Sequence, residues 1–233
     1  MTQPVPRFDV VSIFPEMVTT ALGYGVVGRA LAAGTVGVET WDPRAYTTDR
    51  HRTVDDRPYG GGPGMVMKFE PLAAAVRAAT AARADTGPVV YLSPQGVRFD
   101  DRRARELALS GAVLVCGRYE GVDERFVAAC VDEELSVGDY VLSGGEPAAI
   151  AILDAAIRLI PGVLGDENSA AEDSFAAGIL DYPHYTRPEE IEGYRVPEVL
   201  TSGDHAAISR WRLAEARRRT RARRTDLLAD DSA

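Results

Sequence analysis

The chain has 233 residues, of which 45% are apolar and 26% charged, and its formal net charge is −9. This composition is ordinary for a globular protein, and no apolar run approaches the roughly 20 residues that a membrane helix needs. The two cysteines, Cys116 and Cys130, are too few for a disulfide framework and lack metal-site spacing. We therefore expect a cytoplasmic protein that does not enter a membrane.

Strand-like and helix-like segments alternate along the first two thirds of the chain. Four short runs rich in β-branched and aromatic residues have the length of strands: 8–14, 36–41, 88–92 and 112–116. Stretches with helical spacing lie between and after them: 15–33, 71–84, 100–109, 123–130 and 146–160. This alternation predicts an α/β fold whose parallel sheet is covered by helices on both faces.

The last third of the chain differs in composition. Residues 165–172 read GDENSAAE, which is small and polar and indicates a mobile linker. Prolines then interrupt the chain until a helical stretch begins near His205. We expect one domain over 1–162, a flexible linker over 163–172, and a small, mainly helical domain over 173–233.

Arginine is concentrated near the C-terminus. Eight arginines lie between Arg210 and Arg224, although the whole chain is acidic. A local positive field of this kind favours phosphate binding, and the sum over the chain conceals it. A solvated helix face is the other interpretation, and the residues alone leave both open.

Two glycine runs resemble phosphate-binding motifs. The run GYGVVG (23–28) has the G-x-G-x-x-G pattern of dinucleotide-binding proteins, but that motif requires a strand directly before its first glycine. Here a predicted helix intervenes, which makes nicotinamide binding the weakest hypothesis. The run DDRPYGGGPGM (55–65) lacks the Gly-Lys-Ser/Thr ending of a Walker loop and is typical of a tight surface loop.

Three loops that follow predicted strands are more informative: YLSPQG (91–96), CGRYEGVDER (116–125) and SVGDYVLSGGE (136–146). In an open parallel sheet, ligands bind outside the carboxyl ends of the strands, so we expect these loops to form one pocket. Their small residues and few charges suit an adenine ring and a thioether chain. A triphosphate would require lysine and Mg²⁺ ligands nearby.

Eight motifs in this order resemble the TrmD-type tRNA (guanine-N1)-methyltransferases of the SPOUT class: RPYGGGPGM, YLSPQG, CGRYEGVDER, SVGDYVLSGGE, IPGVLG, EDSF, LDYPHYTRPE and VPEVLTSGDHA. The resemblance implies transfer of a methyl group from S-adenosylmethionine to N1 of the guanosine 3′ of the anticodon (position 37) in tRNA. A non-catalytic RNA-binding protein is the main alternative.

The resemblance also implies features that residue patterns do not reveal. These are a deep trefoil knot on the C-terminal side of the N-terminal domain, a homodimer whose active site uses both protomers, and a need for Mg²⁺. The C-terminal domain would grip the tRNA, which favours phosphate contact for the arginine cluster. One departure is visible: the family's Leu-Pro after SGGE is replaced by Pro147-Ala148.

Site residues carried over from the family fall into two groups. The methyl-donor pocket would be lined by Tyr91, Leu92, Ser93, Pro94, Gln95, Gly117, Tyr119, Glu120, Val137, Gly138, Asp139, Tyr140, Val141, Leu142, Gly144 and Gly145. N1 of guanine carries a proton, so methylation needs a base and a positive group near O6. By resemblance Asp173 is the base, Arg158 serves O6, and Glu120 lies near the guanine edge. Their structural alternatives are a helix N-cap, a C-terminal helix arginine and a solvated loop carboxylate.

Overall fold

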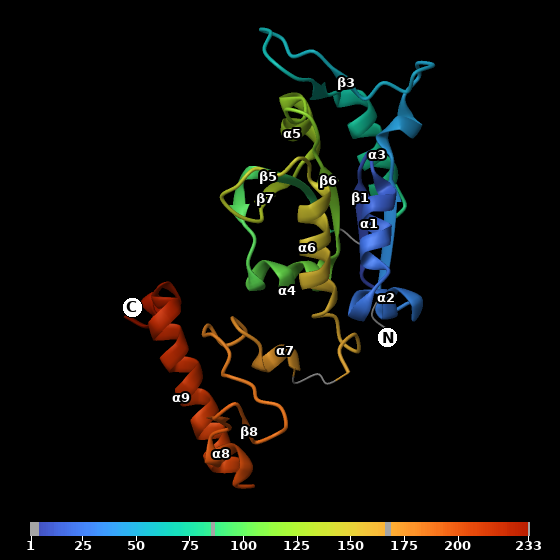
Figure 1. Ribbon diagram of the computed structural model, residues 1–233. Helices are drawn as coiled ribbons and strands as arrows, with labels where there is room; N and C mark the ends of the chain where they lie inside the picture. Colours follow the sequence, from blue (N-terminus) through green and yellow to red (C-terminus); the bar gives the residue numbers. More distant parts are fainter. Residues whose placement is uncertain (1–4, 85–86, 166–168, 233) are drawn as a thin grey trace. The chain divides into compact units, whose positions relative to one another are not determined.

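The computed structural model describes residues 5–84, 87–165 and 169–232 (Figure 1). The chain divides into two compact units, Met1–Gly165 and Asp166–Ala233, and each unit is described by itself. None of the helices within the described ranges is long and apolar enough to cross a membrane.

A five-stranded parallel sheet forms the centre of the first unit. In spatial order its strands are β2 (Gly37–Trp41), β1 (Arg7–Val11), β6 (Ala112–Cys116), β5 (Val89–Arg98) and β7 (Glu133–Ser136). Every residue of the central β6 is buried, as expected for a parallel strand covered on both faces. The predicted α/β fold is confirmed.

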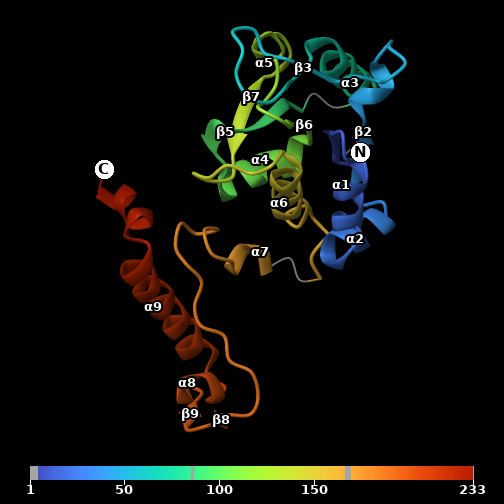
Figure 2. The same cartoon turned by 45° about the horizontal axis from the view of Figure 1, so that its top comes forward.

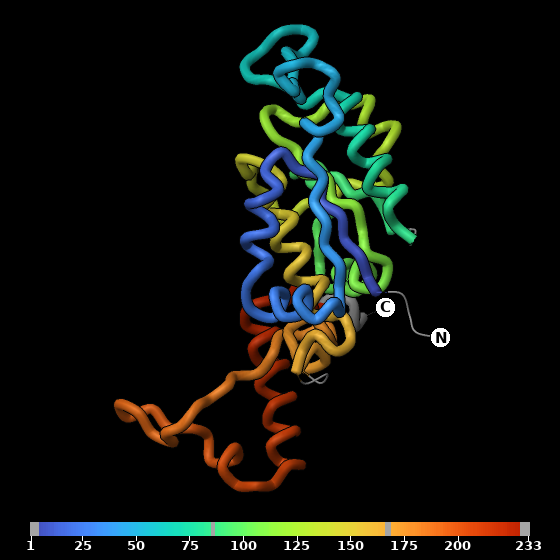
Figure 3. Tube along the Cα trace, turned by 90° about the vertical axis from the view of Figure 1, so that its right-hand side faces the viewer, coloured from blue at the N-terminus to red at the C-terminus, as the bar shows by residue number. Residues whose placement is uncertain are grey.

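Helices cover both faces of this sheet (Figures 2 and 3). One layer consists of α1 (Pro15–Leu22), α2 (Gly25–Ala32), α4 (Asp101–Ser110) and α6 (Glu146–Ile157), and the other of α3 (Phe69–Ala81) and α5 (Glu124–Cys130). Alternate residues of β6 belong to two separate hydrophobic cores: Leu114 is in the core that contains Ile152 of α6, whereas Val113 is in the core that contains Leu72 of α3. Side chains alternate between the faces of a strand, so one apolar run fills both layers.

The predicted helix over 15–33 is wrong as a single element. It is divided into α1 and α2 at Gly23 and Tyr24, and α2 begins at Gly25, whose φ is +63°. A Cβ at Gly28 would lie 2.4 Å from the carbonyl oxygen of Gly23, so only glycine allows this close turn. The glycines of GYGVVG therefore join two helices, and no strand directly precedes them.

Two further local predictions are corrected. Residues 93–96, expected in a loop, lie within β5, and the register shifts because Leu92 and Val97 both pair with Leu135 on β7. The strand β7 was not among the four predicted runs. The other glycine run, 55–65, begins with the short strand β3 (Asp55–Asp56) and ends directly before its antiparallel partner β4 (Val66–Met67).

The second unit is mainly helical. Its elements are α7 (Ser169–Glu172), β8 (Glu190–Ile191), β9 (Tyr194–Arg195), α8 (Glu198–Thr201), α9 (His205–Arg223) and a 3-10 segment, Thr225–Ser232. Asp204 caps α9 by accepting a hydrogen bond from the Ala207 amide at 3.0 Å. Within the predicted linker, residues 166–168 lie outside the described residues, and 169–172 form the one-turn helix α7.

Candidate functional site

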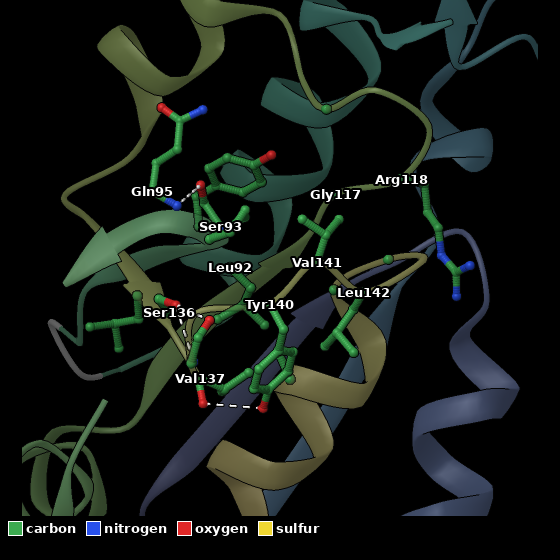
Figure 4. Close-up of a pocket in the computed structure, with 18 of the residues that line it drawn as sticks. Leu92, Ser93, Gln95, Gly117, Arg118, Ser136, Val137, Tyr140, Val141 and Leu142 are labelled. Atoms are coloured by element: carbon green, nitrogen blue, oxygen red, sulfur yellow. Dashed lines mark hydrogen bonds between the residues drawn. The ribbon is translucent and has the colours of Figure 1, made fainter. Parts of the chain in front are cut away.

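Three chain segments meet in one pocket at the carboxyl ends of β5, β6 and β7 (Figure 4). The pocket is lined by Tyr91, Leu92, Ser93, Pro94, Gln95, Gly117, Arg118, Tyr119, Glu120, Gly121, Leu135, Ser136, Val137, Gly138, Tyr140, Val141, Leu142, Gly144, Gly145 and Ala148. The structure thus brings the three predicted loops together. Among the residues predicted to bind the methyl donor, Asp139 lies outside this lining: its side chain is 93% exposed and pairs with Arg98.

The β5 segment forms one wall of the pocket. Ser93 is buried, and its hydroxyl accepts a hydrogen bond from the Gln95 amide at 3.1 Å, which shapes the bulge over β7. Burial, with smaller contributions from Glu134 and Glu124, raises the pKa of Tyr91 to about 12. Tyr91 therefore remains a neutral hydroxyl group at physiological pH.

The β6 segment is held by the last residue of the second glycine run (55–65) and by β4. The Glu120 amide donates to the Met65 carbonyl and the Met67 amide donates to the Gly121 carbonyl, both at 2.9 Å. Tyr119 has φ +62°, in the left-handed region, so this turn is tightly constrained. The second glycine run is thus connected to the pocket, a link that spacing in the sequence did not reveal.

The β7 segment passes directly against the end of β6. The Gly145 amide donates to the Gly117 carbonyl at 2.9 Å, and a Cβ on Gly145 would lie 2.6 Å from the Cα of Cys116. A Cβ on Gly117 would in turn lie 2.8 Å from the Tyr91 hydroxyl. Because these glycines have no Cβ, the backbone itself can form the pocket wall. This role depends on the missing side chain and not on a positive φ.

A buried carboxylate joins the pocket to the carboxyl end of β1. Glu146, fully buried at the first position of α6, accepts hydrogen bonds from the Ser12 hydroxyl at 2.6 Å and the Arg118 Nε at 2.7 Å. The Arg118 guanidinium also lies 4.6 Å from the Phe14 ring centroid and donates to the Ser143 carbonyl at 3.2 Å. Sequence reasoning missed both Arg118 and Glu146, because their partners lie far away along the chain.

Of the three predicted catalytic residues, Glu120 lines the pocket, and Arg158 and Asp173 belong to other parts of the chain. A Cβ on Gly64 would lie 2.3 Å from Glu120 Oε1. Arg158 follows the last residue of α6, about 15 Å along the helix from Ala148 by the 1.5 Å rise per residue. Asp173 belongs to the second unit and is half-buried; its carbonyl accepts from the Ala176 amide, so it begins a turn rather than a helix.

The displaced proline is compatible with the pocket. Pro147 occupies the first turn of α6, where its missing amide hydrogen breaks no helical hydrogen bond. Ala148 is buried and lines the pocket.

Charge is sparse around the pocket, whose ionisable lining includes Arg118 and Glu120. Burial raises the pKa of the neighbouring Cys116 thiol well above its usual range, which makes it a poor nucleophile. Within the described ranges, no group of three or more histidine, cysteine, aspartate or glutamate residues could hold a metal ion. The lining suits a ligand with a flat ring that is held mainly by backbone and small side chains.

Comparisons with known proteins find one family and relatives that share one name. Residues 6–230 match the family described as tRNA (Guanine-1)-methyltransferase TrmD. The chain is 61% identical to the tRNA (guanine-N(1)-)-methyltransferase of Methylococcus capsulatus, over 96% of this chain and 89% of that protein. It is 61% identical to the protein of that name from Halorhodospira halophila, over 96% and 85%, and 58% identical to that from Burkholderia mallei, over 98% and 88%.

Proposed function

Because the chain belongs to the TrmD family of tRNA (guanine-1)-methyltransferases, we propose that it methylates N1 of the guanosine immediately 3′ of the anticodon, position 37, in tRNA. A methyltransferase of this family implies S-adenosylmethionine as the methyl donor. The observation that carries the proposal is the convergence of three strand-end segments on one weakly charged pocket.

The pocket fits the methyl donor by its chemistry. Gly117, Gly144 and Gly145 each stand where a Cβ would collide with a neighbouring atom, so backbone amides and carbonyls reach the cavity. Apolar side chains such as Leu92, Val141 and Leu142 suit an adenine face and a thioether chain. When bound, the methyl donor supplies the methyl group of its sulfonium, and its sulfur keeps the electron pair of the broken S–C bond and becomes a neutral thioether.

The chain's own residues would handle the charge on the guanine. Asp173 would accept the proton of N1 as a general base. The ring nitrogen would then have a free electron pair for the new N–C bond. Arg158 would stabilise the negative charge that grows on O6, and Glu120 would border the guanine edge. The target base would have to leave its stack to reach these groups.

A homodimer reconciles these roles with the geometry. The pocket and Arg158 lie at opposite ends of α6 in one chain. In a symmetric dimer, the end of α6 in one protomer would serve the pocket of its partner. The separation of about 15 Å along α6 in one chain supports this arrangement.

Other family features remain proposals of the same kind. We propose a deep trefoil knot, and the backbone contact of Gly145 with Gly117 at the end of β6 supports it. We also propose a cytoplasmic location and a Mg²⁺ requirement. The chain would be divided into a domain over 1–162, a linker over 163–172 and a second domain over 173–233. The last part would grip the tRNA through the arginines of α9.

One assay tests the proposed function against its alternatives. The protein is incubated with labelled S-adenosylmethionine and unmodified tRNA, and the methylated base is mapped. We expect label at N1 of guanosine 37. Salt-sensitive tRNA binding without methyl transfer would support a non-catalytic RNA-binding protein, and NAD binding without transfer would support an oxidoreductase.

A further inference from the structure

The segment that begins at Asp173 is attached to α9. The Leu180 amide donates to the Thr220 hydroxyl at 2.9 Å, and Thr220 is fully buried. Directly after the helix ends, the Arg224 guanidinium lies 5.6 Å from the ring centroid of Phe175. The arginine-rich helix is therefore also the support of this segment.

Three side chains close a triangle beside Asp173. The Tyr182 hydroxyl donates to Glu172 Oε2 at 2.7 Å, and Arg212 Nη1 lies 3.8 Å from the same oxygen. The Arg212 guanidinium lies 4.7 Å from the Tyr182 ring centroid, so each member contacts the other two. Asp173, Tyr182 and Arg212 line one cavity of the second unit.

We propose that Glu172, Tyr182 and Arg212 form a positioning cluster that fixes the backbone at Asp173 to α9. Glu172 directly precedes Asp173, so a tether on its carboxylate limits where the next side chain can point. The inference rests on the proposed function, because it takes Asp173 as the base. Reacting groups must be held to within a fraction of an ångström, and about 1 Å of misplacement can cost 10²-fold in rate.

The cluster is suited to positioning more than to stability. Glu172 and Arg212 are 57% and 42% exposed, so solvent weakens their ion pair. The hydrogen bond from Tyr182 to a carboxylate is charge-assisted and directional. Burial first, and then the bond to Glu172, raises the pKa of Tyr182 to about 12, so the phenol remains protonated and continues to donate at neutral pH.

The test compares variants of the full-length protein in a methyl-transfer assay. Tyr182→Phe removes the hydroxyl and keeps the ring over Arg212. We expect kcat to fall about tenfold or more, while the tRNA KM and the methyl-donor Kd stay within about twofold. Glu172→Gln retains an acceptor for Tyr182 and should keep most of the activity that Glu172→Ala loses. Tyr194→Phe, at an exposed tyrosine of β9, is the matched control and should behave as wild type.

The outcomes separate this inference from the proposed function. If Asp173→Asn abolishes transfer and Tyr182→Phe leaves kcat unchanged, the positioning cluster is refuted and the base remains. A rise in tRNA KM alone would make Tyr182 an RNA contact and would also overturn the inference. Equal losses in Glu172→Gln and Glu172→Ala would exclude the hydrogen bond as the cause. Full activity in Asp173→Asn would remove the base assignment itself.

Discussion

Single atoms decide the shape of the pocket, most clearly at two neighbouring glycines. A Cβ on Gly144 would lie 2.1 Å from Arg118 Nε, a side chain held by the buried carboxylate of Glu146. A Cβ on Gly145 would meet the Cα of Cys116, which belongs to the central strand. The strand cannot yield as a flexible side chain would, so Gly145 has the lower tolerance for substitution.

We predict that Gly145→Ala weakens binding of S-adenosylmethionine and lowers the free energy of unfolding by about 1–3 kcal/mol, as overpacking does. Gly165→Ala is the control, because a Cβ there would meet nothing within 4 Å. Titration calorimetry and urea unfolding measure the two effects. Wild-type affinity in Gly145→Ala would show that this backbone contact does not shape the pocket.

Asp173→Asn keeps the side-chain shape and removes the basic oxygen. We expect methyl transfer to fall about 10²–10⁴-fold, which is a loss of about 3–5 kcal/mol of transition-state stabilisation. Binding of S-adenosylmethionine should be unchanged, since the substitution alters none of the first-unit residues that line the pocket. Single-turnover kinetics measure the loss, and turnover at the wild-type rate would contradict the role of base.

At the scale of elements, the arginines of α9 and Arg224, which directly follows it, include two distinct sets. Arg212, Arg218 and Arg224 pair with carboxylates: Glu172, Glu215 and Asp226 respectively. Arg210, Arg217 and Arg221 are exposed and make no such pair in the described part of the chain. Their spacing of seven and four residues puts them on one helix face. This second set is suited to phosphates.

We predict that replacing Arg210, Arg217 and Arg221 together by glutamine weakens tRNA binding and reduces the dependence of log K on log salt by about 2–3, which corresponds to three lost phosphate contacts. The control variant replaces the exposed Arg29, Arg77 and Arg102, which lie on three different helices of the first unit, and so removes the same charge elsewhere. Binding measured over a salt series distinguishes them, and equal effects of the two triple variants would rule out a specific role for α9.

The elements themselves were predicted unevenly, for local reasons. The β6 run AVLVC is apolar throughout, and its prediction as a buried strand is confirmed. The β7 strand has four residues, EELS, and was missed because polar side chains at a sheet edge carry little strand signal. The break between α1 and α2 depends on the contact of Gly28 with Gly23, which apolar spacing does not encode.

At the scale of the whole molecule, the two ends of α6 test the proposed dimer. We predict that, at a low concentration of S-adenosylmethionine, Arg158→Ala and Gly145→Ala each transfer methyl groups poorly alone and regain activity when mixed under conditions that exchange subunits. A mixed dimer with shared sites would have one site with an intact pocket and an intact Arg158. Methyl transfer after mixing measures this. No recovery in verified mixed dimers would mean that each chain uses its own Arg158.

Apolar periodicity and glycine-rich turns are local properties of the chain, so they were enough to predict the α/β class, the central strands and the three segments that line the pocket. The contacts between distant residues became visible only in the folded protein. Ser12 and Glu146, 134 positions apart, bond in the core, and Arg158 lies at the end of α6 away from the pocket. Tyr182 meets Arg212 only because the segment after Asp173 packs along α9. Such pairings follow from how the packed elements bring distant positions together, and no short stretch of sequence carries that information.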